Sequence, residues 1–393
     1  MKGLLTENLE LAGKKILLRL DLNVPLKDKR ITELDRINKI IPTIKYLLKK
    51  KSKIIILSHI GRPKGKIEPN LTLEPVSKKL SEILSLEVKL VKDKIDEKLN
   101  YKIDTIKNSS IIMLENIRFN KGEEKNDHNF AKKLSKLGEI YINDAFSCCH
   151  RSHASIDAIT QYIPSYFGIQ IDEEISALKK ITSEIKKPIT CILGGSKIST
   201  KINIISNLIK KFDNIIIVGG MANTILKEKG LNIGKSINEE NCNKVVFEIF
   251  ENAKKYKCKI LYPSDVIVSK NINSTGKNKL INEIETDDII LDIGKNTIYS
   301  IETILSNSKT ILWNGPAGYF ENPFFENGTK KIAKIISRKT QNNNIFSVVG
   351  GGDTVAAINK YNLLNSFNFV STAGGAFLEF LEGKNLPGIT AIK

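Results

Sequence analysis

The feature that most constrains the fold is a series of short, almost continuously apolar runs rich in isoleucine, separated by longer segments with helical periodicity. The runs cover residues 16–20, 54–58, 111–114, 140–142, 189–193, 214–218, 310–313, 345–349 and 368–372. Strands that are apolar on both faces are typical of parallel sheets covered by helices. Because the intervals leave room for crossover helices, the pattern predicts βαβ units and an α/β fold class.

The spacing of apolar residues also predicts helices and a division into domains. Residues 34–51 and 73–86 place apolar residues three and four apart, and residues 171–185 do so before Pro188, which a helix does not cross easily. Because this last helix lies between two series of strands, we expect it to connect two domains. The predicted division is an N-terminal domain over 1–170, a connecting helix over 171–188, a C-terminal domain over 189–375 and a C-terminal segment over 376–393.

The net charge of +18, from 61 basic and 43 acidic residues in a chain of 393, first suggests a nucleic-acid partner. However, 54 of the basic residues are lysines and only 7 are arginines, and the excess is spread along the chain. Specific readers of nucleic acid depend on arginine for bidentate contacts. We therefore expect small anionic substrates and no specific nucleic-acid partner, with polyanion binding as the alternative from a different class.

The cysteines and the apolar runs bear on the compartment. Five cysteines form no CxxC pattern, which favours a reduced cytoplasmic protein. We expect no secretion signal, and no apolar run is long enough to span a membrane. Cys148 and Cys149 lie beside His150 and His153, but adjacent cysteines hold a single zinc ion poorly, so we expect no zinc site and no Cys–His nucleophile from this segment.

Polar and arginine residues follow the strands of the first half. Ligands of open α/β sheets bind at the carboxyl ends of the strands, and arginine grips phosphates and carboxylates with a planar fork. The sequence therefore predicts a pocket for a small, highly anionic ligand with hydroxyl groups, although single arginines could equally cap helices or form ion pairs. The residues that predict it are Asp21, Asn23, Arg36, His59, Arg62, Arg118, Arg151 and His153. Arg19, Arg30 and Arg338 lack this context and are interpreted as structural.

Glycines follow the strands of the second half. Gly194-Gly195-Ser196-Lys197 and Gly350-Gly351-Gly352-Asp353-Thr354 come directly after strands and before helical segments. Such turns let backbone N–H groups approach phosphates, and Asp353 could hold Mg²⁺ between them. Lys197 and Lys201, four apart, are expected on one face of a helix. The pairs 219–220 and 374–375 add to this edge, although glycines could simply close tight turns. The two edges predict two different ligands facing one cleft.

Ten segments resemble the phosphoglycerate kinase family, in order and over essentially the whole chain. The matching segments are 15–26, 34–37, 57–65, 114–119, 143–155, 187–202, 218–224, 312–321, 348–354 and 371–389. The resemblance implies two Rossmann-like domains, each a mostly parallel sheet with helices on both faces, and a C-terminal segment that returns to the N-terminal domain. It implies reversible transfer of a phosphoryl group from 1,3-bisphosphoglycerate to ADP, giving 3-phosphoglycerate and ATP, with Mg²⁺, in glycolysis and gluconeogenesis.

The resemblance also implies roles for individual residues, motif by motif. Asp21, Asn23, Arg36, His59, Arg62, Arg118 and Arg151 would bind the glycerate substrate, and Lys201, Asn314, Glu321, Gly351, Gly352, Asp353 and Thr354 would bind the nucleotide. Arg36, Lys197, Gly351 and Gly374 would stabilise the moving phosphoryl group, and Asp353 would hold Mg²⁺. We expect a cytoplasmic monomer with hinge-bending domains. The alternative within this class is another acyl-phosphate or sugar kinase.

Two departures from the family pattern lie near these residues. Ser147-Cys148-Cys149 replaces the small, glycine-containing link that the family usually has before His150 and Arg151. Ile290 stands where glycine is common near the nucleotide. Neither change alters the charged residues of the predicted sites.

Overall fold

A computed structural model describes residues 3–28 and 30–392 and divides the chain into two compact units. The first unit extends to Ser176 and includes the chain from Asn385 onward, and the second unit is Ala177–Lys384. Helix α5 (Ile169–Thr182) crosses the boundary between them. Helix α12 (Gly375–Leu381) belongs to the second unit, and α13 (Pro387–Thr390) belongs to the first.

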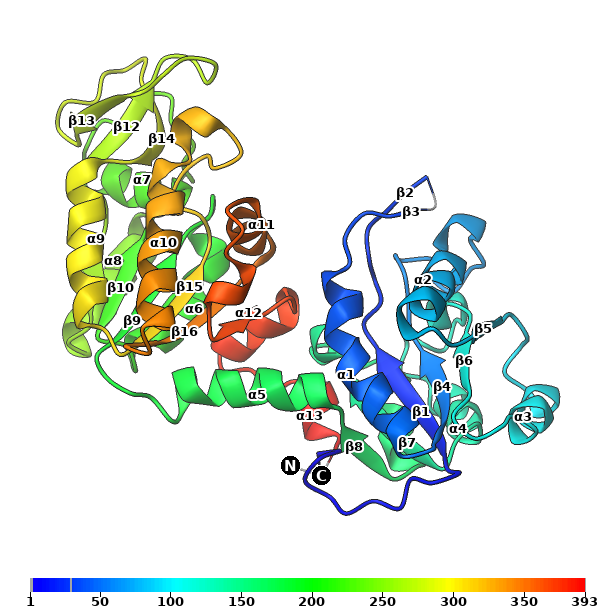
Figure 1. The fold of residues 1–393 in the computed structure, drawn as a ribbon. Coiled ribbons are helices and arrows are strands. Elements are labelled where there is room, and N and C mark those ends of the chain that lie inside the picture. Colours follow the sequence, from blue (N-terminus) through cyan, green and yellow to red (C-terminus); the bar gives the residue numbers. More distant parts are fainter. Residues whose placement is uncertain (1–2, 29, 393) are drawn as a thin grey trace. The chain divides into compact units, whose positions relative to one another are not determined.

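The first unit is built on a six-stranded sheet in the order β5-β6-β4-β1-β7-β8, with every neighbouring pair parallel (Figure 1). The strands are β1 (Lys15–Leu20), β4 (Lys53–Leu57), β5 (Val88–Val91), β6 (Ile111–Leu114), β7 (Ile140–Asp144) and β8 (Ser165–Phe167). The helices are α1 (Asp35–Lys49), α2 (Glu74–Leu84), α3 (Glu97–Asp104) and α4 (His128–Ser135), and β2 (Leu26–Lys27) pairs antiparallel with β3 (Arg30–Ile31).

The core of the first unit follows from the apolar strands. Ile16 lies between Ile54 and Ile140 in the register of the sheet; Ile16 and Ile54 belong to one buried apolar cluster, and the partly buried Ile140 packs against it. Helix α1 adds Ile40, Ile44 and other apolar residues spaced three or four apart along one face of the helix. This apolar face packs against one face of the sheet.

The second unit contains a parallel sheet of the same size in the order β11-β10-β9-β15-β16-β17. Its strands are β9 (Ile189–Leu193), β10 (Asn214–Ile217), β11 (Lys259–Leu261), β15 (Thr310–Asn314), β16 (Phe346–Gly350) and β17 (Phe369–Val370). Its helices are α6 (Ile202–Ile209), α7 (Gly220–Glu228), α8 (Asn243–Lys255), α9 (Lys295–Asn307), α10 (Asn327–Gln341) and α11 (Gly352–Lys360). Figure 1 shows α9 and α10 packed side by side along this sheet.

The second unit also has an antiparallel sheet that the sequence pattern did not predict. It pairs β12 (Asp265–Ser269) with β13 (Lys277–Leu280) and β14 (Ile289–Ile293). By contrast, all nine predicted strands are present in the two parallel sheets, and the predicted α/β fold class is confirmed. Within residues 3–28 and 30–392, no helix combines the length and apolar character that crossing a membrane requires.

Candidate active site

The predicted anion-binding residues of the first unit gather where parallel strands end. Asp21 follows β1, His59 follows β4, Arg118 lies on the 3₁₀ turn after β6, and Ser147 lies after β7. Neighbouring parallel strands bring these positions to one edge of the sheet, which is where α/β folds bind ligands.

Asp21 is the hub of this cluster. Its carboxylate accepts hydrogen bonds from the backbone N–H of Asn23, at 3.1 Å, from Arg36 Nη1 and from the Ser147 hydroxyl. Arg36 reaches it from the first turn of α1, where the positive end of the helix dipole adds to the guanidinium charge. The Arg36 side chain remains 31% exposed, so it can also contact a ligand.

Arg19, which the sequence pattern left as a structural residue, also contacts this cluster. It is fully buried within β1, where Nε donates to Ser155 Oγ at 2.9 Å and Nη2 lies 3.2 Å from His59 Nδ1. Ser155 in turn donates to the buried carboxylate of Glu123 at 2.6 Å. The sequence held a signal for this role, because an arginine inside an otherwise apolar strand needs buried polar partners.

Both buried histidines of the cluster are held neutral. Burial, together with Arg19 and Arg118, places the pKa of His59 well below its ordinary value. Burial and the charges of Arg118 and Arg19 lower the pKa of His153 to about 3. Because a guanidinium group only donates, Nδ1 of His59 is the acceptor, and the proton lies on Nε2. His59 therefore offers one N–H donor.

The other predicted residues of this edge differ in how many contacts they make with the rest of the protein. Asn23 Oδ1 accepts from the N–H of Gly61 at 2.9 Å, and Arg118 Nη1 donates to the Gly61 carbonyl at 2.8 Å. Arg151 contacts His150, with Nε 3.1 Å from Nε2. Arg62 is exposed, and within the described residues no hydrogen bond or ion pair joins it to the others. Arg118 Nε is buried without a hydrogen-bond partner among those residues, and the Glu124 carboxylate lies 3.7 Å from it as an ion-pair partner.

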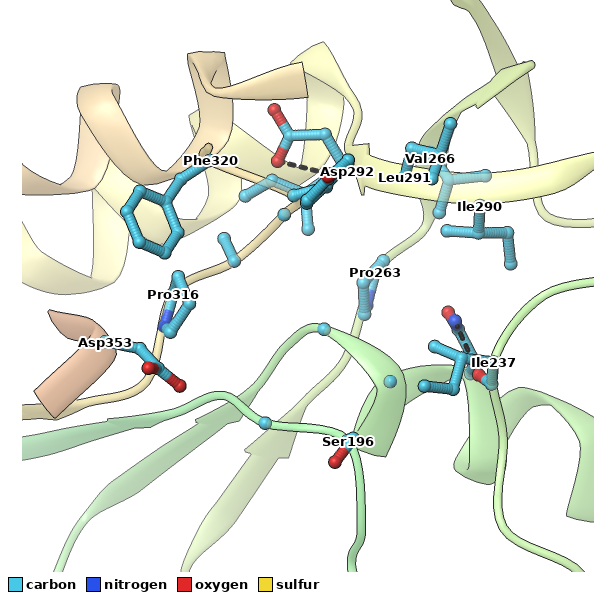
Figure 2. A pocket seen from close by; sticks show the side chains of 18 of the residues that line it. Ser196, Ile237, Pro263, Val266, Ile290, Leu291, Asp292, Pro316, Phe320 and Asp353 are labelled. Atoms are coloured by element: carbon cyan, nitrogen blue, oxygen red, sulfur yellow. Dashed lines mark hydrogen bonds between the residues drawn. The ribbon is translucent and has the colours of Figure 1, made fainter. Parts of the chain in front are cut away.

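The second unit holds a pocket of about 450 Å³ with two different ends (Figure 2). At one end lie Asp353, Pro316 and the glycine turns after β9 and β10. At the other end lie Ile237, Val266 and Ile290, of which the last two come from the antiparallel sheet. The pocket therefore combines an apolar slot with a turn region suited to anions.

The backbone requires glycine at some positions of these turns but not at all of them. Gly351 has a φ of +94° just before α11, and a Cβ there would lie 2.8 Å from the Asn314 amide nitrogen. Gly194 and Gly315 pass each other so closely that a Cβ on Gly194 would lie 2.1 Å from the Pro316 carbonyl oxygen. A Cβ on Gly352 would meet open space, and this residue begins α11. The free N–H groups of that turn can face an anion.

Lys201 and Asn314 form a buried link across this edge of the sheet. Lys201 Nζ donates to the Gly194 carbonyl and to Asn314 Oδ1, both at 2.7 Å, and burial lowers its pKa. Asn314 donates to the Gly350 carbonyl at 2.9 Å. Thr354 is buried, and its hydroxyl accepts from the Gly315 N–H at 2.7 Å. These contacts fix the turn that carries Gly351 and Gly352.

The prediction that Lys197 and Lys201 share one helix face is wrong. A 3₁₀ turn occupies Ser199–Lys201 and α6 begins only at Ile202, so Lys197 precedes any helix. Thr200 Oγ1 donates to the Lys197 carbonyl at 2.9 Å, a local bond that competes with helical pairing. Lys197 is exposed, whereas Lys201 is turned into the protein.

Sequence reasoning missed the part of the pocket wall around Asp292. This carboxyl lines the pocket at the end of β14 and accepts from the N–H groups of Gly328, at 2.6 Å, and Ile293, at 2.9 Å. Burial raises its pKa to about 7. An aspartate inside an apolar run was the available signal.

Two α/β units, one with an arginine-rich cluster and the other with a glycine-lined pocket, fit the class of two-domain phosphotransferases. A family model described as "Phosphoglycerate kinase" matches residues 6–384. The chain therefore belongs to the phosphoglycerate kinase family, which transfers a phosphoryl group between 1,3-bisphosphoglycerate and ADP.

Individual relatives are similar to this chain over nearly their full length. The chain is 47% identical over 386 residues to a phosphoglycerate kinase of Dictyoglomus turgidum, covering 98% of this chain and 96% of that one. It is 44% identical over 389 residues to one from Wolbachia of Drosophila simulans, covering 98% of both. The solved phosphoglycerate kinase of Coxiella burnetii superposes with a TM-score of 0.91 at 38% identity, over 98% of this chain and 97% of that one.

Proposed function

We propose that the first unit binds the phosphoglycerate substrate at the Asp21 cluster and that the second unit binds ADP or ATP in its glycine-lined pocket. The observation that carries this assignment is the neutral His59, fixed beside the permanently charged Arg19. Fixed guanidinium charge with neutral donors suits a ligand that carries both phosphates and hydroxyls. Because Nδ1 of His59 already accepts from Arg19 and Nε2 carries the proton, His59 has no free lone pair with which to act as a general base.

The proposed ligands of the glycerate substrate share one edge of the first sheet. Arg36 and Arg118 would grip its charged groups, and Asn23 and His59 would bond its hydroxyl and carboxyl oxygens. The full set is Asp21, Asn23, Arg36, His59, Arg62, Arg118 and Arg151. Arg62, which is exposed, would contact the ligand only from the rim.

The proposed nucleotide ligands line or support the pocket of the second unit. The apolar end, with Ile237 and Ile290, suits a base, and the turn at Gly351 and Gly352 suits the phosphates. Glu321 lines the same pocket and would accept from the ribose. The full set is Lys201, Asn314, Glu321, Gly351, Gly352, Asp353 and Thr354.

Asp353 is the residue that would hold Mg²⁺. Asp353 is the second residue of α11, and its exposed carboxylate lines the pocket close to the turn at Gly351 and Gly352 (Figure 2). A carboxylate together with phosphate oxygens is the hard oxygen set that Mg²⁺ prefers, so the donors fit. The ion would neutralise phosphate charge when it is bound.

The proposed mechanism is direct in-line transfer between the two substrates. The leaving carboxylate of an acyl phosphate is a weak base, so no general acid is required. The protein then contributes position and charge: Arg36 and Lys197 would contact the moving phosphoryl group, while the amides of Gly351 and Gly374 would donate to its oxygens. Lys197 is exposed, and within residues 3–28 and 30–392 no hydrogen bond or ion pair engages its ammonium group, so it is available for this role.

Direct transfer also requires that the two substrates meet. We propose that the units close about α5 when both substrates are bound, and that the enzyme is a monomer of a reduced cytoplasm. All five cysteines are free and buried, which supports that compartment. Small-angle scattering tests closure, because the radius of gyration should fall only when both substrates are present.

A coupled assay of the purified protein with 3-phosphoglycerate, ATP and Mg²⁺ tests the proposed function. We expect turnover that depends on all three components. Absence of turnover together with phosphorylation of another carboxylic acid or a sugar would overturn the substrate assignment. Steep loss of affinity for RNA with added salt, accompanied by a defined footprint, would instead favour a nucleic-acid role.

A further inference from the structure

A network of buried polar groups leads from His59 into the core of the first unit. Arg19, Ser155 and Glu123 have no exposed surface. Arg19 Nη2 contacts His59 Nδ1 at 3.2 Å, and Arg19 Nε donates to Ser155 Oγ at 2.9 Å. Ser155 Oγ then donates to Glu123 Oε1 at 2.6 Å. Glu123 is therefore two hydrogen bonds away from the guanidinium group that contacts His59. We call these four residues the Glu123 network.

The direction of the hydrogen bonds in this network is set by Glu123. A serine hydroxyl has one proton to donate, and a guanidinium group cannot accept it. The Ser155 proton therefore points to the carboxylate, and its oxygen faces Arg19 Nε. The rest of Ser155 is also held, because its N–H donates to Glu123 Oε2 at 3.0 Å and its carbonyl accepts from the Tyr141 hydroxyl at 2.5 Å.

The charges around Glu123 fit a role toward Arg19. Burial raises the pKa of Glu123, while the charge of Arg19 and the two bonds from Ser155 oppose that rise. The carboxylate in turn favours the charged form of Arg19, and a buried charge is costly without such a partner. His153 Nδ1 lies 3.9 Å from Glu123 Oε1, but its pKa of about 3 leaves the ring neutral. The cation that Glu123 serves is therefore Arg19.

We propose that Glu123 is a positioning residue for the glycerate substrate. Acting through Ser155, it fixes Arg19 and thereby keeps the single proton of His59 on Nε2, where it can be donated to the ligand. Glu123 is fully buried, so its effect on the substrate is indirect. The consequence for binding rests on the proposed function, which assigns His59 to the glycerate substrate.

Two conservative variants of the full-length protein break the network at different points. Glu123→Gln keeps the shape of the side chain but offers one acceptor oxygen to two Ser155 donors. The backbone N–H takes that oxygen, so the hydroxyl proton is left without an acceptor or turns toward Arg19. Ser155→Ala instead removes the acceptor of Arg19 Nε and keeps the Ser155 N–H.

The first measurement is ¹⁵N NMR of the His59 ring, assigned by comparison with His59→Gln. We expect the wild-type protein to show one tautomer, with the proton on Nε2, and both variants to show a mixture of tautomers. The double variant should change the ring signals no more than either single variant, because both act through the same bond.

The second measurement is steady-state kinetics. In both variants the KM for 3-phosphoglycerate should rise by about tenfold while kcat changes by less than about twofold, as loss of ground-state binding predicts. Thr43→Val is the matched control, since Thr43 and Asp144 form another buried hydroxyl–carboxylate pair of the same unit. This control should lower stability and leave the His59 ring signals and the KM unchanged.

The outcomes separate the network from the proposed function. An unchanged tautomer in both Glu123→Gln and Ser155→Ala overturns the positioning role, whatever happens to the KM. The same tautomer change in Thr43→Val also overturns it, because the change would then report general loosening of the unit. A tautomer change that is specific to the two network variants but leaves the KM unaltered keeps the network and overturns the placement of the glycerate substrate at His59.

Discussion

Arg19 Nη2 donates to His59 Nδ1 across 3.2 Å inside the first unit, and this contact fixes the tautomer of the histidine. The guanidinium has no lone pair to accept a bond, so the imidazole must carry its proton on Nε2. Burial and, to a lesser extent, the nearby positive charge lower the pKa of His59 and keep the ring neutral. A strand residue that contacts no solvent thereby determines what His59 can offer to a substrate.

The first prediction concerns Arg19 as a positioning residue. In Arg19→Met the pKa of His59 should rise but stay below its ordinary value, because burial is the larger cause of its depression. The KM for 3-phosphoglycerate should rise by about tenfold, which corresponds to leaving a buried polar group unsatisfied. NMR titration of the His59 ring and steady-state kinetics measure the two effects. An unchanged His59 pKa would contradict the role even if the variant were less stable.

The second prediction concerns Asp144, a buried carboxyl at the end of β7. Burial raises its pKa to about 7, although Thr43 and the N–H of Ile171 donate to it. The folded state keeps its proton up to about pH 7, whereas the unfolded chain releases it near pH 4. The free energy of unfolding should therefore fall as pH rises through this window, by up to about 4 kcal/mol, and stay level above it.

Asp144→Asn should remove this contribution, so that its stability relative to the wild type increases between about pH 4 and pH 7. Thr43→Val deletes a donor that favours the charged form and should extend the window to higher pH. Urea unfolding across the pH range measures both. Parallel pH profiles for wild type and Asp144→Asn would show that Asp144 ionises normally.

The third prediction concerns Arg36. If it contacts the moving phosphoryl group, Arg36→Ala should lower kcat by about 10³–10⁵, as loss of an arginine finger does elsewhere. Arg36→Lys should recover only part of the rate, because an ammonium group cannot bind bidentately. Single-turnover kinetics with both substrates saturating provides the measurement. A variant that keeps more than a tenth of the wild-type kcat is incompatible with this role.

The fourth prediction compares two adjacent glycines. Gly351→Ala places a Cβ at a φ of +94° and 2.8 Å from Asn314, so it should destabilise the protein by about 1–3 kcal/mol and weaken ADP binding. Gly352→Ala meets open space at the start of α11 and should leave stability within about 0.5 kcal/mol of the wild type. If phosphates occupy that space, Gly352→Ala should still weaken ADP binding. Equal loss of stability in both would refute the backbone argument.

The parallel sheets could be predicted because burial on both faces leaves an unbroken apolar run, as in Ile54–Leu57. The antiparallel sheet could not, since β13 is short and largely exposed and leaves no strong periodic pattern. The spacing of Lys197 and Lys201 also gave a wrong prediction of a shared helix face. The Thr200 hydroxyl donates to the Lys197 carbonyl, which a helix would use for its own backbone hydrogen bond. Val266 in the pocket wall was missed for the same reason as its sheet, whereas only the family resemblance placed Ile290 near the nucleotide.

The cluster around Asp21 likewise contains residues that could be predicted from the sequence and residues that could not. Residues just beyond strand ends, such as Asp21 and His59, were found because topology alone places them on one edge. Arg19 was assigned no site role, since its importance depends on partners more than 35 residues away, His59 and Ser155. Contacts of this kind follow from the folded register and not from any local spacing.

The central claim is that each unit binds its own substrate, and calorimetric titration of two variants tests it most directly. His59→Ala, in the first unit, should weaken 3-phosphoglycerate binding by about tenfold or more and leave ADP binding unchanged. Lys201→Met, in the second unit, should do the reverse. If both variants weaken the same ligand, or if neither affects the ligand of its own unit, the assignment of the two sites is wrong.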